Sequence, residues 1–485
     1  MDLADKIEHF DVLIVGAGLS GIGAGAHFTR SLPGKSFAIL EGREAMGGTW
    51  DLFRYPGVRS DSDMFTLGYR FRPWQDRKAI ADGPAILEYV RSTATDYGLN
   101  DKIRYGHRVR HAKWDFSNAR WTVDVEVANE TGLKRLTCGF LYLCTGYYDY
   151  NAGYTPEWNG VDRFKGTIVH PQQWPGGLDY SGKRVVVIGS GATAVTLVPA
   201  MAETAAHVTM LQRSPTYIIT LPSEDRIANG LGGVLPARVA YTLSRWKNIL
   251  RQMFFYNLSR SRPRMIKRFI KKGVKAELGD DVATQHFEPK YEPWDQRVCV
   301  VPDGDLFASL KNGSASVITG QIDTFTESGL RLTSGKTVDA DIVVAATGLV
   351  LKIMAGLDLA VDGAPVDLSK AFTYKGMMYS GVPNLASAFG YTNASWTLKC
   401  DLTSEYVIRL IKYMNRRGFR SCMPRLSEPI EAVPVLDFNS GYVLRALHEL
   451  PKQGDRRPWR LYQNYFKDLA SLRYGSITDD AIEFK

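Results

Sequence analysis

Two stretches of the chain, far apart in the sequence, repeat the same order of an apolar strand, a glycine-rich turn and a helix of small residues. In the first, residues 11–15 (DVLIV) precede the turn 16–21 (GAGLSG); in the second, residues 183–188 (KRVVVI) precede the turn 189–194 (GSGATA). In such a βαβ unit the glycines let backbone N–H groups at a helix N-terminus approach a pyrophosphate. We therefore predict an α/β protein with two Rossmann-like dinucleotide-binding domains. The residues expected to bind nucleotide are Gly16, Gly18, Ser20 and Gly21 in the first turn, and Gly189, Ser190, Gly191, Ala192, Thr193 and Ala194 in the second.

The residue that follows the next strand of each unit indicates which nucleotide the unit takes. After the first turn, strand 36–40 ends at Glu41, whose carboxylate can accept from both hydroxyls of a ribose, as in FAD or NAD. The strand, the spacing and the acid together outweigh the alternative of a glycine-rich turn without a ligand. After the second turn, strand 207–211 leads to Arg213 and Ser214, which suit the 2′-phosphate of NADP. We expect FAD and NADPH as a pair, in which the nicotinamide reduces the flavin.

The order of these units along the chain predicts one domain inserted in another. Two similar strand-and-turn segments, ending at Gly146 and Gly348, lie on either side of the second unit. A long stretch after the second unit lacks a strand pattern and is predicted to be a helical insertion. The predicted bounds are 1–148 and 349–485 for the FAD-binding domain, 149–348 for the NADPH-binding domain, and about 225–295 for the helical insertion.

Composition narrows the class of protein further. The chain has 485 residues, of which 45% are hydrophobic and 23% are charged, a globular mixture that excludes disordered and fibrous classes. Its five cysteines form no CxxC pair, and Cys138 and Cys144 are interpreted as core residues. We therefore expect neither a metal site nor the redox dithiol of a disulfide reductase, which leaves oxygen as the electron acceptor. The N-terminus does not read as a signal peptide and no apolar run approaches a membrane span, so we expect a cytoplasmic protein.

The positive charge is concentrated in one segment. The net charge is +9, and twelve Lys or Arg residues lie between Arg238 and Lys275 without any Asp or Glu, which leaves −3 for the rest of the chain. This distribution argues against a nucleic-acid-binding protein, whose basic surface would be broader. The cations alternate with large apolar residues over 245–256 and 265–272. Helices of this kind more often pack on their own domain, but they also lie on anionic lipid, so docking at the inner face of the cell membrane stays open.

A third pattern lies just before the second glycine-rich turn. Residues 164–176 read FKGTIVHPQQWPG, which resembles the fingerprint FxGxxxHxxxWP of Baeyer–Villiger monooxygenases, with its final Asp or Gly. Residues 47–61 (GGTWDLFRYPGVRSD) and 390–399 (GYTNASWTLK) also resemble this class B flavoprotein family, closest to its bacterial ethionamide-activating subgroup. The resemblance covers essentially the whole chain. The fingerprint residues are Phe164, Gly166, His170, Trp174 and Pro175.

The resemblance implies a reaction and an active-site arginine. FAD reduced by NADPH reacts with O2 to a C4a-peroxyflavin, which converts a small apolar ketone to an ester, and oxidation of sulfides and thioamide prodrugs is a further expected activity. Arg297 is the implied residue that stabilises the peroxide anion, and Asp61 is the implied acid that orients it. Gln296 departs from relatives that carry a lysine there, which leaves more of the NADPH recognition to Arg213. The implied flavin contacts are Gly48, Thr49, Trp50, Asp51, Asp61 and Val109.

Two other classes of protein stay open. The sister family of N- and S-oxygenating flavin monooxygenases has a similar fingerprint that usually lacks the Trp-Pro pair, so Trp174, Pro175 and Arg297 favour the Baeyer–Villiger type. A flavin-binding protein of a membrane surface, without turnover, would not need two cofactor sites. Trp396 is interpreted either as a pocket residue near the nicotinamide ribose or as a core tryptophan.

Overall fold

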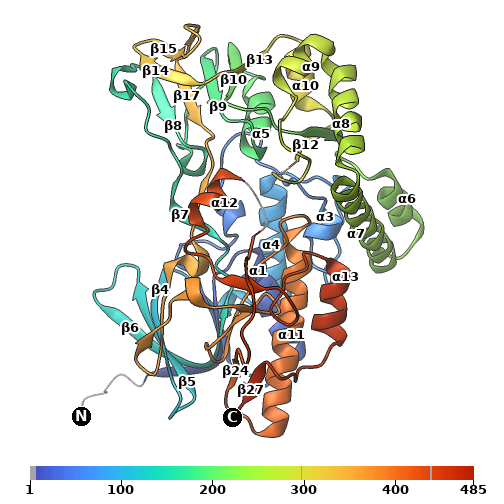
Figure 1. Cartoon of the computed structure of the whole chain (residues 1–485). Coiled ribbons are helices and arrows are strands. Elements are labelled where there is room, and N and C mark those ends of the chain that lie inside the picture. The colour runs from blue at the N-terminus through green and yellow to red at the C-terminus, as the bar shows by residue number, and fades with distance from the viewer. Residues whose placement is uncertain (1–6, 297, 437–439) are drawn as a thin grey trace.

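The protein consists of two α/β units, and in Figure 1 one lies above the other; we call them the upper and the lower unit. The structure is a computed structural model and describes residues 7–296, 298–436 and 440–485. The lower unit contains the first glycine-rich turn, and the upper unit contains the second.

The lower unit is built on a nine-stranded sheet in the order β20-β19-β4-β5-β6-β1-β2-β3, with β23 also paired to β6. β1 runs parallel to both β2 and β6. Its residues Val12 and Ile14 are buried in the core that contains α1 (Leu19–Ser31), whereas Leu13 and Val15 are buried on the opposite face, in a second core that contains residues of β4 and β5. β23 follows the upper unit in sequence, yet it pairs in parallel with β6. The lower unit is therefore assembled from both ends of the chain. Its strands are β1 (Glu8–Val15), β2 (Phe37–Leu40), β3 (Ile103–Arg104), β4 (His107–Asp115), β5 (Arg120–Val127), β6 (Leu133–Leu143), β19 (Asp358–Val361), β20 (Ala364–Pro365) and β23 (Leu385–Ser387).

The upper unit is built on a five-stranded parallel sheet in the order β13-β10-β9-β17-β8. β9 and β17 lie at its centre, and their residues alternate between two buried faces. Val185, Val187 and Val344 pack in the core that contains α5 and α10, whereas Val186, Ile188 and Val343 pack in a smaller core on the opposite face. The strands are β8 (Thr167–Val169), β9 (Arg184–Ile188), β10 (His207–Gln212), β13 (Ala315–Thr319) and β17 (Ile342–Ala345), and the two helices are α5 (Ala192–Met201) and α10 (Asp305–Lys311).

Smaller elements complete the two units. β7 (Tyr148–Gly153) and β18 (Leu349–Leu351) pair antiparallel where the chain passes between the units. The other helices of the lower unit are α1 (Leu19–Ser31), α2 (Thr49–Leu52), α3 (Met64–Leu67), α4 (Gly83–Asp96), α11 (Trp396–Arg417), α12 (Gly441–Ala446) and α13 (Tyr465–Asp468). The remaining strands are β11 (Ile218–Leu221), β12 (Cys299–Pro302), β14 (Ile322–Thr326), β15 (Gly329–Leu332), β16 (Thr337–Asp339), β21 (Thr373–Tyr374), β22 (Met378–Tyr379), β24 (Cys422–Pro424), β25 (Ala432–Pro434), β26 (Lys452–Gly454) and β27 (Ile482–Phe484).

Four helices occupy the segment predicted to be a helical insertion, and they divide between the two units. Tyr241 and Ile249 of α7 belong to the same hydrophobic core as Phe65 and other residues of the lower unit. Val274 of α8 belongs to the core of the upper unit, together with Phe287 just after α9. The four helices are α6 (Arg226–Val234), α7 (Ala237–Ser261), α8 (Pro263–Leu278) and α9 (Asp280–His286).

A buried arginine fixes α7 to the lower unit. The Arg245 guanidinium donates to the carbonyls of Phe65 at 2.8 Å and Gly68 at 2.7 Å, and it lies 3.5 Å from the Asp401 carboxylate of α11. Asp401 also accepts from the imidazole of His27 on α1 at 3.1 Å. Because removing one partner of a buried ion pair typically costs ~3–5 kcal/mol, these contacts hold the helix firmly in place.

Candidate active site

The first glycine-rich turn is shaped by close backbone contacts that only glycine permits. Gly16 has a φ of +102°, and a Cβ there would lie 2.6 Å from the Cys144 carbonyl oxygen. A Cβ at Gly21 would lie 1.8 Å from the Gly16 carbonyl oxygen, so α1 could not begin so close to β1 with any other residue. Among the described residues, no side chain caps α1 at Gly18, which leaves its first N–H groups for a ligand.

Glu41 is fixed beside this turn. One carboxylate oxygen accepts from the backbone N–H of Ala17 at 2.8 Å, and the other accepts from the backbone N–H of Arg43 at 2.9 Å. The residue is only 7% exposed, and burial raises the pKa of its carboxyl although both backbone hydrogen bonds lower it. The acid that sequence spacing assigned to a ribose is therefore held in one orientation at the mouth of the turn.

A second pair of glycines closes over the first turn. Gly47 donates its N–H to the Ala17 carbonyl at 3.0 Å. Gly48 has a φ of +57°, and a Cβ there would lie 3.0 Å from the Gly18 Cα. Thr49 is the first residue of α2, and its hydroxyl lies 3.4 Å from the hydroxyl of Tyr150. Gly48 therefore lies directly against the first glycine-rich turn, and Thr49 follows it at the start of α2.

The other implied flavin contacts have protein partners. Asp51 is buried and pairs with three arginines: Arg43 at 2.8 Å, and Arg54 and Arg91 at 3.4 Å each. Trp50 packs against the core of the lower unit. Val109 is buried in the second core of that unit, next to a shift in the register of β4 and β5. The Asp51 carboxylate is therefore occupied by ion pairs with arginines, whereas Trp50 and Val109 pack in the cores of the lower unit.

The second glycine-rich turn is more open than the first. Gly189 has a φ of +140°, and a Cβ there would lie 2.3 Å from the Ala346 carbonyl oxygen. At Gly191, in contrast, a Cβ would meet no described atom within 4 Å. The third position is Ala194, which is fully buried in the upper core. Ala192 is exposed, so the N-terminus of α5 faces outward.

The residues after β10 meet this second turn. The Ser190 hydroxyl donates to the Ser214 carbonyl at 3.1 Å and lies 2.8 Å from the Thr216 hydroxyl. Arg213 is exposed and makes no ion pair with any described residue. The structure thus places the backbone of Ser214 against the second glycine-rich turn, with Arg213 exposed next to it in sequence.

The stretch 54–61 lies between the two units. Tyr55 is buried, its hydroxyl lies within hydrogen-bonding reach of Thr193, and burial raises its pKa to about 12. A Cβ at Gly57, whose φ is +73°, would lie 2.7 Å from the Ala200 Cβ of α5. Arg59 forms an ion pair with Asp305 of α10. The loop therefore packs against the helices of the upper unit, a role that sequence comparison alone did not indicate.

Of the predicted pair Asp61 and Arg297, the structure describes Asp61. Arg297 lies outside the described residues. Asp61 is exposed at the end of the interdomain loop. The segment before Arg297 packs on α7: the rings of Trp294 and Tyr256 are 5.5 Å apart, and the Asp295 carboxylate accepts from Arg260 at 2.8 Å.

The fingerprint histidine lies where the two interdomain connections cross. The Gly348 carbonyl accepts from His170 Nε2 at 3.2 Å and from the Tyr154 backbone N–H at 3.0 Å. His170 Nδ1 accepts from the Gln172 backbone N–H at 3.1 Å, and burial lowers the pKa of the imidazole. A Cβ at Gly153 would lie 1.9 Å from the His170 ring, so that glycine makes room for it. His170 is thus bonded to backbone and ties the crossing together.

The other fingerprint residues pack on the upper unit. The Phe164 ring contacts Phe325 at 5.8 Å in a small core of the upper unit. A Cβ at Gly166 would lie 2.4 Å from the Asp341 carbonyl oxygen. Trp174 packs against the main upper core, and Pro175 follows it. Residues 164–175, which carry the fingerprint, therefore form one segment that packs on the upper unit.

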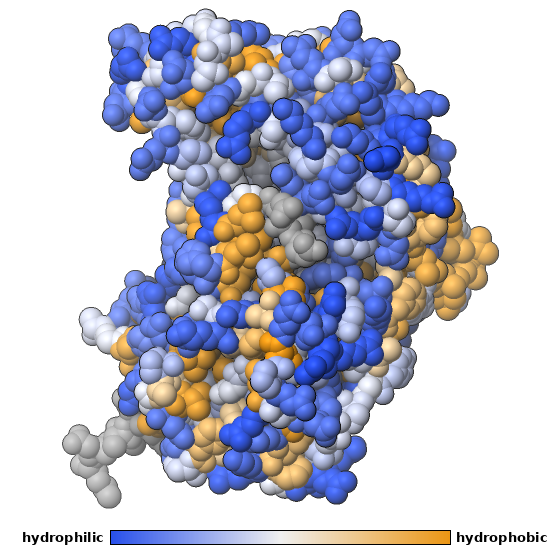
Figure 2. Space-filling model, viewed as in Figure 1, coloured by the Kyte–Doolittle hydropathy of each residue, from blue (hydrophilic) through white to orange (hydrophobic). Residues whose placement is uncertain are grey.

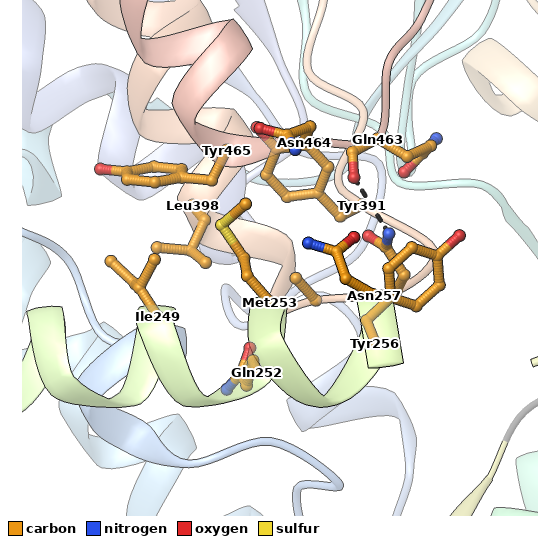
Figure 3. Close-up of a pocket in the computed structure, with 12 residues that line it drawn as sticks. Ile249, Gln252, Met253, Tyr256, Asn257, Tyr391, Leu398, Gln463, Asn464 and Tyr465 are labelled. Carbon is orange, nitrogen blue, oxygen red and sulfur yellow. Dashed lines mark hydrogen bonds between the residues drawn. The ribbon is translucent and has the colours of Figure 1, made fainter. Parts of the chain in front are cut away.

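A narrow pocket lies between α7 and the segment before α11, with residues from around α13 at its far side (Figure 3). Neighbouring Trp396 donates from its indole to the Ser20 hydroxyl at 3.0 Å and stacks on Tyr147 at 4.8 Å, which links the pocket wall to the first glycine-rich turn. Sequence reasoning missed this pocket because its walls come from three distant segments. Its apolar lining is Ile249, Met253, Tyr391, Ala394, Leu398 and Tyr465, and its polar lining is Gln252, Tyr256, Asn257, Asn393, Gln463 and Asn464.

The cysteines supply no competing redox centre. All five lie in the described part of the chain, are buried and form no disulfide. Burial raises the pKa of Cys400 to about 12 and that of Cys144 well above its ordinary value. These thiols are core residues, as the sequence predicted for Cys138 and Cys144.

Comparison with known proteins identifies the family. Residues 75–379 match the model of the flavin-binding monooxygenase-like family, and residues 14–75 match that of an NAD(P)-binding Rossmann-like domain. The chain is 53% identical over 481 residues to the FAD-containing monooxygenase EthA of Mycobacterium tuberculosis, with 98% of each chain covered. It is 51% identical over 484 residues to a putative FAD-containing monooxygenase, MymA, of the same species, again with 98% of each covered.

The chain therefore belongs to the flavin-binding monooxygenase-like family. Within it, the similarity to proteins named EthA and MymA extends over nearly the whole length, which confirms the predicted flavoprotein monooxygenase class. A solved complex of OTEMO with FAD and NADP has the same fold, with a TM-score of 0.76, 23% identity, and 99% of this chain and 100% of that one covered. The predicted two-domain α/β fold class is confirmed.

Proposed function

We propose that the protein is an FAD- and NADPH-dependent Baeyer–Villiger monooxygenase that converts small apolar ketones to esters and also oxidises sulfides and thioamides. The observation that carries this proposal is the pairing of two glycine-rich turns with opposite charge chemistry. A buried carboxylate accompanies one turn, and an exposed guanidinium, which forms no ion pair within the described part of the chain, accompanies the other. The names of the curated relatives, and the FAD and NADP of the OTEMO complex, support the same pair of cofactors.

The residues of the first turn fit FAD. Gly16, Gly18 and Gly48 leave a cradle that side chains would fill, beside the uncapped N-terminus of α1. The pyrophosphate would lie there, because backbone N–H groups and the helix dipole favour an anion. Glu41 would accept from the ribose hydroxyls, since each of its oxygens has further lone pairs beyond the one backbone bond it accepts.

The residues of the second turn fit NADPH. The space above Gly191 and the outward-facing start of α5 would take its pyrophosphate. Arg213 and the Ser214 hydroxyl would bind the 2′-phosphate, which NADH lacks. Tyr55 and Gly57, which join the lower loop to α5, would keep the two nucleotides in register for hydride transfer.

Bound FAD supplies the two-electron transfer and the activation of O2, and NADPH supplies the electrons. In balance, a ketone, O2, NADPH and a proton give an ester, NADP⁺ and water. We assign to Arg297 the stabilisation of the negative charge that develops during oxygen transfer, and to Asp61 the orientation of that guanidinium. The contacts of Trp294 and Asp295 with α7 would anchor the segment that carries Arg297.

The test uses purified FAD-loaded protein, NADPH, labelled ¹⁸O2 and a panel of ketones and sulfides, with products identified by mass spectrometry. We expect esters that carry one labelled oxygen, formed with consumption of NADPH. Sulfoxides from sulfides, without ester from any ketone, would instead indicate the N- and S-oxygenating sister type. NADPH oxidation that yields only hydrogen peroxide with every compound would contradict the proposal.

A single substitution separates the two halves of the reaction. Arg297→Ala should bind FAD and be reduced by NADPH at the wild-type rate, yet lose ester formation by ~10²–10³-fold, the usual effect of one electrostatic partner. Arg297→Lys keeps the positive charge but not the planar guanidinium, so its rate of ester formation should lie between that of the wild type and that of Arg297→Ala. Rapid-mixing spectra report reduction and product analysis reports oxygenation; an alanine variant with full ester formation would show that Arg297 is misassigned.

A further inference from the structure

α7 is apolar on two opposite faces. Its inner face, with Tyr241 and Ile249, is buried in the lower unit. Its outer face carries Val239, Leu243, Leu250 and Phe254, which are 46% to 69% exposed. The spacing of four, seven and four residues places these side chains in one stripe along the helix. A surface helix needs only one apolar face for folding, so the outer stripe is not explained by the fold.

α6 extends this stripe. Ile227 is 62% exposed and Val234 is 84% exposed, and α6 packs beside α7. Lys247 of α7 donates to Asp225 at the start of α6 at 2.6 Å, which fixes the two helices together. Figure 2 shows orange side chains gathered over α6 and α7 at the right-hand edge of the molecule. We call this the α6–α7 apolar surface: Ile227, Val234, Val239, Leu243, Leu250 and Phe254.

Unpaired cations accompany the α6–α7 apolar surface. Of the twelve between Arg238 and Lys275, five form ion pairs, and Lys267 donates to the Pro289 carbonyl. No Asp or Glu occurs from residue 226 to residue 276. The exposed cations without an ion pair to any described residue are Arg238, Arg251, Arg262, Arg264, Arg268 and Lys272.

We propose that the α6–α7 apolar surface docks on the surface of an anionic lipid bilayer. The apolar side chains would enter the interface between headgroups and acyl chains, and the cations on α7 and α8 would meet the lipid phosphates. The positive charge around this surface favours an anionic bilayer over a second copy of the chain. A second copy of the chain would bring the same unpaired cations face to face, which disfavours self-association. None of the described helices has both the length and the apolarity needed to cross a membrane, so docking is peripheral.

The position of the pocket adds a consequence that rests on the proposed function. Ile249 and Met253 line the pocket on the inner side of α7 (Figure 3). The adjacent Leu250 and Phe254 belong to the outer stripe. One helix therefore separates the pocket from the proposed lipid contact. Substrates that partition into the bilayer would reach the enzyme from there.

The experiment is co-sedimentation of the full-length FAD-loaded protein with vesicles of phosphatidylcholine alone or mixed with phosphatidylglycerol, at low and high salt. We expect sedimentation with the anionic vesicles only, and less of it at high salt. Co-sedimentation does not depend on turnover, so it tests lipid docking separately from the proposed reaction. No sedimentation with anionic vesicles at low salt, or equal sedimentation with both kinds, would overturn the proposal.

Matched variants locate the contact. Leu250→Glu with Phe254→Glu should abolish sedimentation, whereas Leu133→Glu with Tyr474→Glu, at equally exposed positions elsewhere, should leave it unchanged. Arg264→Gln, Arg268→Gln and Lys272→Gln together should reduce binding at least tenfold at low salt, and the same charge removed at Lys134, Lys183 and Arg416 should not.

FAD content and the unfolding temperature confirm that each variant is folded. Equal loss of binding in test and control variants would overturn the location. Light scattering supplies the remaining outcome: a dimer dissolved by the Leu250–Phe254 variant, without vesicle binding by the wild type, would make a second copy the occupant and refute lipid docking.

Discussion

The two glycine-rich turns have the same sequence pattern, but one is covered and the other is open. At Gly18 a Cβ would lie 3.4 Å from the Gly48 Cα, because a second glycine turn crosses over the first. At Gly191, the equivalent position, a Cβ would meet no described atom within 4 Å. A nucleotide in the first turn would be enclosed by the protein, whereas one in the second would remain in contact with solvent.

The charged residues differ in the same way. Glu41 is buried and already bonded to two backbone N–H groups, so its orientation is fixed before any ligand arrives. Arg213 is exposed, and no described residue pairs with it, so its charge is left for the ligand. Under the proposed function, this difference suits a resident cofactor in the first site, which is preorganised, and an exchangeable cosubstrate in the second, which would be released after each turnover.

The largest expected effect comes from reversing the charge at Glu41. Glu41→Arg should lose FAD completely, because a guanidinium cannot accept from the ribose hydroxyls or from the Ala17 and Arg43 N–H groups. Visible absorbance and FAD released on denaturation measure the loss, and circular dichroism checks the fold. Glu44→Arg, at an exposed position nearby, is the control and should stay yellow. A yellow Glu41→Arg protein would contradict the assignment of the first turn to FAD.

A pair of substitutions at the third position of the turns tests the difference in packing. Gly21→Ala would place a methyl group 1.8 Å from the Gly16 carbonyl oxygen, so α1 must move, at a cost of about 3 kcal/mol. Ala194→Gly removes one buried methyl and adds backbone freedom, which costs ~1 kcal/mol. Thermal unfolding with saturating FAD measures both. Equal destabilisation would mean that the two helices begin equally close to their strands.

Removing the guanidinium at Arg213 should affect only the open site. Arg213→Ala should raise the KM for NADPH by about 10- to 100-fold, the equivalent of hydrogen bonds to a charged group, and should leave the KM for NADH and the FAD content unchanged. Steady-state kinetics with both nucleotides measures the change. Arg331→Ala, an exposed arginine elsewhere in the upper unit, is the control. A wild type that uses NADH and NADPH equally well would show that the 2′-phosphate is not read here.

Local patterns in the sequence predicted the fold and both turns. A glycine forced by a carbonyl two or three ångströms away, as at Gly16 and Gly189, leaves its mark within a few residues of the strand it follows. Glu41 and Arg213 could be found because the length of a βαβ unit fixes where its second strand ends. These features depend on short segments, so one sequence was enough.

Long-range packing left no such mark. Arg245 looks like any of the twelve cations in its segment, yet it is buried and fixes α7 to the lower unit, while six others stay exposed and unpaired among the described residues. Gly57 reads as a turn glycine, but it is there because α5 of the other unit lies against it. The pocket behind α7 combines three distant segments. Burial and contact between such segments depend on the assembled fold.

The smallest expected effect concerns the crossing that joins the two sites. Burial lowers the pKa of His170, so its imidazole is neutral in the fold and accepts from the Gln172 N–H. The stability that this arrangement contributes is fully present above the ordinary histidine pKa of ~6.5 and is lost as the pH falls through that value toward the lower pKa of the folded state. The unfolding temperature of the wild type should therefore fall more steeply than that of His170→Asn between about pH 7.5 and pH 5.5, by about 2 °C. His448→Asn, at an exposed histidine, is the control and should follow the wild type. Parallel curves for wild type and His170→Asn would show that the crossing does not depend on a neutral imidazole.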